Sequence, residues 1–171
     1  MSKKILVVAA LLTVVSVSGA FGWGIGIQGG WNKGIPGNIA LTLKFDPWAF
    51  AGNFYIAPHR TAFGLTADYW FLNDNIAGPL NWFIGAGLGG TISIWENGYS
   101  YKHPHKNEYY TNNVSFGMSA RLPIGLNMML PVGPVELEPY LQVVPALWLN
   151  FVPYFAPDFD IDLNLGLRVH L

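Results

Sequence analysis

Bulky apolar residues alternate with small or polar residues through most of the chain. Between residues 39 and 43, for example, Ile39, Leu41 and Leu43 are bulky, whereas Ala40 and Thr42 are small. Successive side chains of a β-strand point to opposite faces of a sheet, so a period of two predicts strands with one apolar face. Eight segments show the pattern, and residues 48–57 show it least regularly. They are residues 23–31, 38–45, 48–57, 63–71, 82–94, 114–124, 135–143 and 160–171.

Short runs of turn-forming residues separate these segments. Gly, Pro, Asn and Asp favour turns because they tolerate or fix unusual backbone angles, or bond to their own backbone. The sequence contains no linker, low-complexity tract or internal repeat, which predicts one domain over residues 21–171. The turn-forming runs are residues 34–37, 46–47, 58–60, 73–75, 131–134 and 156–158.

The first twenty residues follow a different pattern. Lys3 and Lys4 precede an apolar run over residues 5–17, and the small residues Ser18 and Ala20 follow it. A basic start, an apolar run and a small-x-small exit are typical of a secretory signal peptide, here residues 1–20. The alternative is an uncleaved anchor, but a membrane-spanning helix needs about 20 apolar residues and this run is shorter.

The two faces of the expected strands carry side chains of different size, which indicates which face lines the inside of a barrel. One face carries aliphatic and aromatic residues, and the other carries Gly, Ser, Thr, Asn and the charged residues. An eight-stranded barrel has room inside only for modest side chains, so the bulky face belongs outside, against lipid. A bilayer also requires that the sheet close on itself. We therefore predict an all-β fold, an eight-stranded antiparallel up-and-down transmembrane β-barrel; a soluble lipocalin-like barrel around a ligand is the alternative.

Overall composition agrees with a membrane barrel. The chain is 51% hydrophobic and only 11% charged, against about 25% charged in an ordinary soluble domain. With both termini in the periplasm, the outer loops would be 32–37, 58–60, 95–111 and 150–157, and the inner turns 46–47, 72–79 and 128–133. Two aromatic girdles would mark the membrane surfaces. We expect Trp23, Tyr69, Phe71 and Trp82 in one girdle and Trp31, Phe63 and Trp95 in the other.

Several function classes are excluded by residue content. Nine Lys and Arg face ten Asp and Glu without a basic block, which argues against a nucleic-acid partner. The chain has no Cys and no nucleotide-binding or phosphate-loop motif, so we expect no cofactor. His103 and His105, near Glu108, could bind a metal, but His-x-His in an exposed loop is usually solvated, so we predict no metal site. His170 lies at the opposite end from Ser115, and we expect no enzyme.

The charged residues on the inward face are the first candidate site. Hairpin geometry places Arg121 diagonally across from Glu138, with Arg168 near the same carboxylate. Charges away from water must be paired, so these residues predict a structural plug in the lumen, with a gate as the alternative. The outer half of the lumen, including Gly30, Gly87 and Gly89, would leave room for water or a small ligand. The plug residues are Lys44, Asp68, Arg121, Glu136, Glu138 and Arg168.

The longest expected loop, 95–111, is the second candidate site. Tyrosines give large amphipathic contact areas at low entropic cost, which favours a surface that binds an extracellular protein or small ligand. The alternative is a loop that packs over the barrel mouth. The residues of interest are Tyr99, Tyr101, Lys102, His103, His105, Tyr109 and Tyr110.

The last strand resembles the C-terminal sorting signal of bacterial outer-membrane barrels. Asn164 and Gly166 occupy its polar and glycine positions, and Val169 and Leu171 stand where aromatic residues are usual. More loosely, three runs resemble the small eight-stranded outer-membrane proteins of spirochaetes: Leu-Thr-Ala-Asp-Tyr-Trp at 65–70, Gly-Pro-Leu-Asn-Trp at 78–82 and Gly-Ala-Gly-Leu-Gly at 85–89. The OmpA transmembrane domain and OmpW are similar in size and strand count. The resemblance implies an outer-membrane location, lipid contact and insertion by the barrel-assembly machinery.

Proteins of this class serve as structural barrels, pores, adhesins or, rarely, lipid enzymes. We therefore expect a plugged or narrow barrel with a structural or adhesin-like role through residues 95–111. The alternative function is a small pore or a conduit for a hydrophobic ligand through the glycine-lined lumen.

Overall fold

The computed structural model describes residues 23–32, 35–57, 59–102, 109–152 and 155–171, all of them in strands or in the short connections between strands. The expected signal peptide lies outside these residues. No helix in the described ranges is long and apolar enough to cross a membrane. The strands are β1 (Trp23–Asn32), β2 (Ile35–Phe45), β3 (Trp48–Ala57), β4 (Arg60–Ala77), β5 (Leu80–Lys102), β6 (Tyr109–Arg121), β7 (Ile124–Met128), β8 (Leu130–Val132), β9 (Val135–Val152) and β10 (Ala156–His170).

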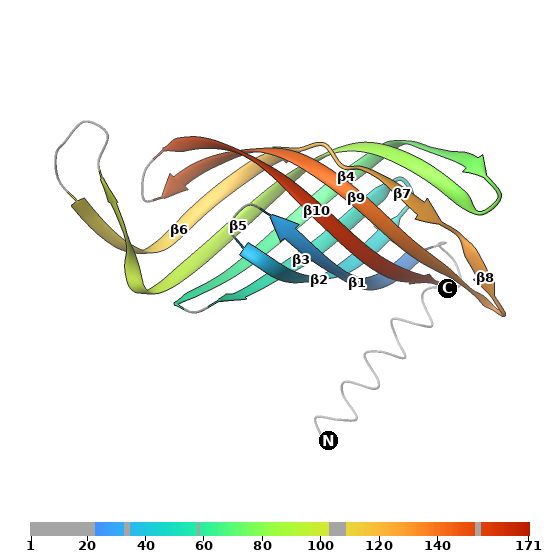
Figure 1. The fold of residues 1–171 in the computed structure, drawn as a ribbon, viewed down its shortest axis with the longest axis horizontal. Helices are drawn as coiled ribbons and strands as arrows, with labels where there is room; N and C mark the ends of the chain where they lie inside the picture. The colour runs from blue at the N-terminus through green and yellow to red at the C-terminus, as the bar shows by residue number, and fades with distance from the viewer. Residues whose placement is uncertain (1–22, 33–34, 58, 103–108, 153–154) are drawn as a thin grey trace, which may run out of the picture.

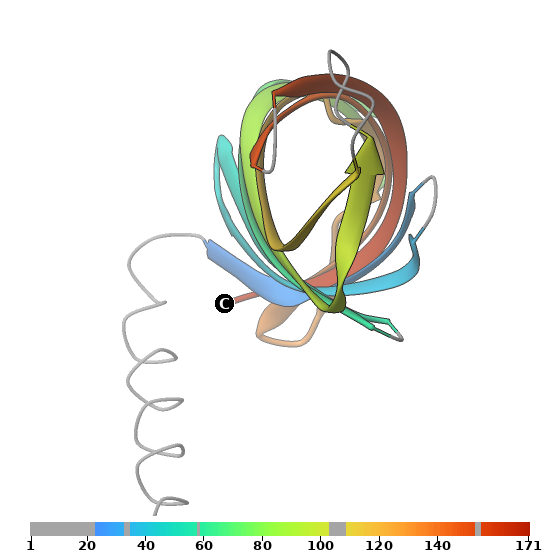
Figure 2. The ribbon, with the colours of Figure 1, turned by 90° about the vertical axis from the view of Figure 1, so that its left-hand side faces the viewer.

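The strands form one closed antiparallel sheet. Strands β1 to β6 pair in chain order, each with its neighbour. β6 then pairs with β9, and β10 pairs with both β9 and β1. The end-on view in Figure 2 shows the resulting oval ring. The prediction of an all-β antiparallel barrel is confirmed.

Strands β6, β7 and β8 together occupy one position in the ring. All three pair with β9, and both β6 and β7 pair with β5, so the ten segments make eight barrel positions. The interruption falls at Pro123, which lacks an N–H. Around it the wall is held by bonds from the N–H of Leu122 to the carbonyl of Pro145 (3.0 Å) and from the N–H of Gly85 to the carbonyl of Pro123 (2.8 Å).

The bulky face of the sheet points outward. On β2, Ile39 and Leu41 are 66% and 60% exposed, whereas Ala40 and Thr42 between them are fully buried. The small, polar face therefore lines the lumen, as the sequence predicts. The alternative of a soluble barrel with its bulky residues turned inward is wrong for this chain.

The hairpins are longer than the sequence pattern indicates. The turn between β4 and β5 is two residues, 78–79, rather than 72–79, because strand pairing continues to Ala77 and Leu80. Gly78, with φ of 55°, makes this tight turn, and the side-chain amide of Asn75 donates to its carbonyl at 2.7 Å.

Most of the expected loop 95–111 is also strand. After an irregularity beyond Ile94, β5 and β6 pair again from Tyr99 opposite Asn112 to Lys102 opposite Tyr109. Figure 1 shows this two-stranded extension at the left, projecting beyond the rest of the barrel. Likewise, β9 and β10 pair as far as Asn150 and Ala156, inside the expected loop 150–157.

The expected aromatic girdles need one correction. Trp31, Phe63, Tyr69 and Phe71 are 41–64% exposed on the outer face. Trp82 has the same outward parity on β5. Trp23 is only 7% exposed, and its ring stacks on that of Phe45, with 5.9 Å between the ring centroids. Trp95 instead shares the lumen-facing parity of buried Ser93 and lies over Arg60.

The guanidinium carbon of Arg60 is 4.7 Å from the centroid of the Trp95 ring, and Arg60 donates to Ser93 at 3.1 Å. Trp95 therefore belongs to the lumen and not to a girdle.

Candidate functional site

The centre of the lumen site is the carboxylate of Glu138, a fully buried residue on β9. Its Oε1 accepts hydrogen bonds from Lys44 Nζ and Asn127 Nδ2, each at 2.8 Å. Its Oε2 contacts Arg168 Nη1 at 3.1 Å and His170 Nε2 at 2.8 Å. A carboxylate offers about four acceptor positions, so these contacts occupy its capacity.

Strand register explains how these residues meet. Glu138 stands directly opposite Arg168 across the β9–β10 ladder. Lys44 on β2 and His170 on β10 both stand opposite Gly24 on the strand between them. A Cβ at Gly24 would lie 2.6 Å from His170 Nε2, so the missing side chain makes the space in which the imidazole lies. Lys44 and His170 therefore reach the same carboxylate from either side of β1.

Aromatic rings complete the surroundings of the cations. Lys44 Nζ lies 4.4 Å from the centroid of the Trp70 ring, and the guanidinium carbon of Arg168 lies 3.9 Å from that of Tyr140. Trp70 in turn stacks on Phe83, with 3.7 Å between ring centroids. Ring faces carry negative potential, so they stabilise cations that have left water.

Arg121 belongs to a second ion pair and not to the Glu138 cluster. Its Nε lies 2.9 Å from Asp68 Oδ1, and both side chains are buried. Gly87 separates these two residues in the ladder, and its lack of a side chain lets them meet above it. In the β6–β9 ladder Arg121 stands opposite Ala146, eight residues beyond Glu138. The expected Arg121–Glu138 pair is therefore wrong, whereas the expected Glu138–Arg168 contact is present.

Glu136 lies outside both clusters. It is exposed at the start of β9, although it shares the inward parity of Glu138. Asp46, which the sequence pattern did not single out, is also mostly exposed, and its Oδ1 lies 3.3 Å from Lys44 Nζ. The Lys44 ammonium therefore lies between a buried carboxylate and one at the barrel end.

The lumen glycines do not leave open space. The Tyr140 ring fills the position where a Cβ of Gly166 would lie, and the Tyr140 hydroxyl donates to Gln28 Oε1 at 2.8 Å. A Cβ at Gly89 would lie 2.6 Å from Ser119 Oγ. The expectation that Gly30, Gly87 and Gly89 leave room for a ligand is wrong, because the side chains of Asn164, Asp68 and Ser119 occupy the space beside them.

A small cavity lies at the centre of the lumen, among residues that the structure describes. It has a volume of about 10 Å³ and lies among Gln28, Thr66, Asp68, Gln142 and Arg168, with other residues of the same layer. That volume corresponds to about one water molecule. Water bound there would have polar partners on several strands.

The other predicted residues occupy separate parts of the chain. Asn164 is buried beside Gly30, Gly166 pairs with Gln28, and Val169 pairs with Ile25, so the residues that resemble a sorting signal lie on the strand that closes the ring. Leu171 follows the end of that strand and is 38% exposed.

Of the candidate interaction residues, Tyr99, Tyr101 and Lys102 lie in β5 and Tyr109 and Tyr110 in β6. His103 and His105 lie outside the described residues. Within the described ranges, no three His, Asp or Glu side chains are close enough together to hold a metal ion.

Comparison with known proteins shows a similarity in structure. No protein-family model matches the chain, and no curated protein matches it. Among solved structures, the chain is similar to the crystal structure of Neisserial surface protein A (NspA). The two sequences are 15% identical, the alignment covers 88% of this chain and 97% of that chain, and the TM-score is 0.41.

Proposed function

We propose that this protein is a bacterial outer-membrane β-barrel whose lumen is closed by its buried ion pairs and which displays the β5–β6 extension at the cell surface. Export would use residues 1–20 as a signal peptide, and insertion would use the barrel-assembly machinery. Its role would be structural or adhesin-like. The observation that carries the proposal is the belt of large apolar side chains on the outer face.

This belt runs around the ring. Leu41 on β2, Leu65 on β4, Leu88 on β5 and Leu165 on β10 are each 59–64% exposed, and every barrel position contributes similar residues. Soluble monomers rarely expose continuous apolar patches beyond a few hundred Å². A bilayer removes this difficulty, because lipid chains cover the belt.

The height of the belt is close to that of the apolar band of a membrane. On β4, exposed aromatic residues run from Phe63 to Phe71. The eight residue steps between them span about 26 Å along the strand, which is about 20 Å of height at a strand tilt of about 40°. Barrels of the outer membrane have an apolar band about 25 Å tall between aromatic girdles.

The packed lumen favours a closed barrel over the pore that the sequence left as an alternative. Glu138 binds cations from β2 and β10, Asp68 binds Arg121 across β5, and the central cavity is about the size of one water. Ion flow would require these pairs to separate. The same saturation of Glu138 leaves it without a lone pair for a substrate, so we propose no catalytic role.

The β5–β6 extension supports the proposed surface role. Its paired segments, 99–102 and 109–112, project beyond the other strands of the barrel (Figure 1) and contain four tyrosines. Two-stranded ribbons leave backbone groups free along both edges, to which a strand of another protein can add. The proposed partner is an extracellular protein.

The membrane assignment is tested by refolding residues 21–171 into detergent and then into vesicles. A closed barrel migrates differently on a gel before and after boiling, and it protects its strands from added protease. Cleavage confined to residues 99–112 would support both the barrel and the exposed extension. A soluble species that shows no heat-dependent shift would overturn the proposal.

A further inference from the structure

The outer face of the barrel contains a hollow that the plug and the surface extension do not explain. It lies across β2 to β6, has a volume of about 670 Å³, and is lined by apolar side chains apart from Thr66. Ligand pockets in proteins have volumes of about 300–1,000 Å³. The hollow is therefore large enough to be a binding site.

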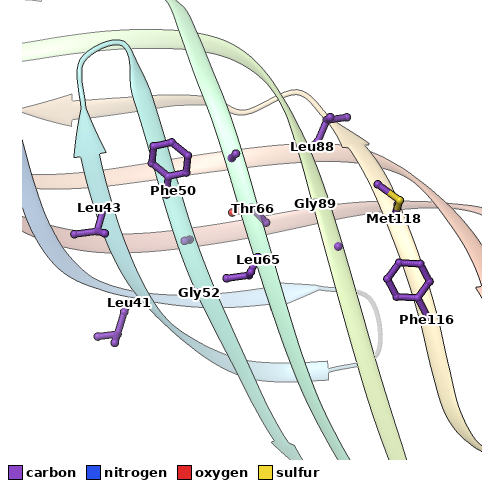
Figure 3. A pocket seen from close by; sticks show the side chains of 13 residues that line it. Leu41, Leu43, Phe50, Gly52, Leu65, Thr66, Leu88, Gly89, Phe116 and Met118 are labelled. Carbon is purple, nitrogen blue, oxygen red and sulfur yellow. The ribbon is translucent and has the colours of Figure 1, made fainter.

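Small residues form the bottom of the hollow on both sides of Leu65, and larger residues form its outer sides. Gly52 on β3, Ala67 on β4 and Gly90 on β5 have the outward parity of the strand but little or no side chain. In Figure 3, Leu41 and Leu43 stand on one side and Phe116 and Met118 on the other, with Gly52 and Leu65 between. The result is an apolar trough in the sheet.

The trough lies midway across the belt. Along β3 and β4 it is centred on residues 50–52 and 65–67, between the aromatic contacts Trp48–Tyr69 and Phe54–Phe63. The lining includes no charged side chain, so it offers nothing to a lipid headgroup. Its depth in the membrane and its chemistry match the hydrocarbon part of a lipid.

We propose that this trough binds an acyl chain of an outer-membrane lipid and holds it against the barrel. The proposal rests on the proposed membrane location. Lipid tails are as apolar as leucine, so the preference for this site comes from van der Waals contact with the trough and not from hydrophobic transfer.

A second copy of the protein is a poorer occupant. In a two-fold symmetric dimer each trough would face its own counterpart, because the same patch is used on both subunits. Two hollows set against each other leave unfilled space, and packed interfaces do not tolerate such voids. A flexible chain fills the trough without this cost.

The test is a pair of matched variants. Gly90→Leu fills the trough, and a Cβ at Gly90 meets its nearest atom, the carbonyl oxygen of Gly117, only at 4.0 Å. Gly29→Leu is the control, because Gly29 is also outward, its Cβ would meet Asn38 O at 3.9 Å, and it lies on β1, outside the trough. Both changes add the same side chain to an outward-facing strand position.

The probe is phosphatidylethanolamine with a diazirine at the middle of one acyl chain, mixed into vesicles of phosphatidylethanolamine and phosphatidylglycerol. After photolysis, peptide mapping locates the labelled residues. We expect labelling concentrated at Leu41, Leu65 and Met118 in the wild type and in Gly29→Leu. In Gly90→Leu it should fall to the level of the rest of the belt.

Three other results would overturn the proposal. They are uniform labelling of the belt, trough labelling that Gly90→Leu leaves unchanged, and a dimer in native mass spectrometry that Gly90→Leu dissociates. Failure of the membrane assignment would look different, because no strand would then be labelled and the gel shift on boiling would be absent.

Discussion

Replacing Glu138 with alanine should strongly destabilise the barrel. The change removes one buried carboxylate and leaves Lys44 and Arg168 close together, with His170 and Asn127 also deprived of their acceptor. Removing one partner of a buried ion pair typically costs about 3–5 kcal/mol, because the remaining charge is buried without compensation. Two cations are left here without their carboxylate, so a loss within that range is expected.

The assay is urea unfolding of the refolded protein, followed by the gel shift on boiling. With an m-value of about 2 kcal/mol/M, the expected loss lowers the midpoint by about 1.5–2.5 M. Glu138→Gln should fall between the alanine variant and the wild type, since it keeps an oxygen acceptor but loses the charge. Glu136→Ala is the control, because Glu136 is an exposed carboxylate two residues away on the same strand.

The reasoning fails if Glu138→Ala unfolds at the wild-type midpoint. It also fails if Glu136→Ala is as damaging as Glu138→Ala, because the effect would then come from strand β9 in general. A midpoint lowered only in the Glu138 variants assigns the stabilisation to the buried cluster.

Three further predictions concern the packed lumen. Gly166→Ala should lower the urea midpoint, since the alanine Cβ would overlap the Tyr140 ring. Gly29→Ala on the outer face should leave the midpoint unchanged, and equal effects of the two changes would contradict the packing argument. Arg121→Ala should lower the free energy of unfolding by about 3–5 kcal/mol, because Asp68 is left buried without its cation. Adding Asp68→Ala should restore part of that stability, and a double variant no more stable than Arg121→Ala argues against the ion pair. In planar bilayers the wild type should show no steady conductance, and steady openings would support the pore.

The sequence was sufficient for the fold because alternation is a local property. Ile39 and Leu41 reveal their face without any knowledge of their neighbours, and the same holds for each strand in the ring. The position of the strand ends was harder to predict. Asn73 and Asp74 favour turns, yet both lie within a strand, because pairing with β5 continues past them.

The partners within the lumen depend on register across three strands, which a single sequence does not specify. Arg121 and Asp68 meet only because Gly87 lies between them. A lumen-facing glycine could have been taken as a sign that large side chains from both neighbouring strands converge there, and not as a sign of open space. Trp95 resembles a girdle residue by its aromatic ring alone. Its parity with Ser93 on the same strand indicates the lumen instead.

The cluster around Glu138 also bears on the order of assembly. Its partners come from β2, β7 and β10, and β10 supplies both Arg168 and His170. Arg168 and His170 reach the carboxylate when β10 pairs with β9. Lys44 lies on β2, on the other side of the seam between β10 and β1, so it reaches Glu138 only when that seam closes. Closure of the ring and the completion of charge pairing in the interior therefore take place in one step.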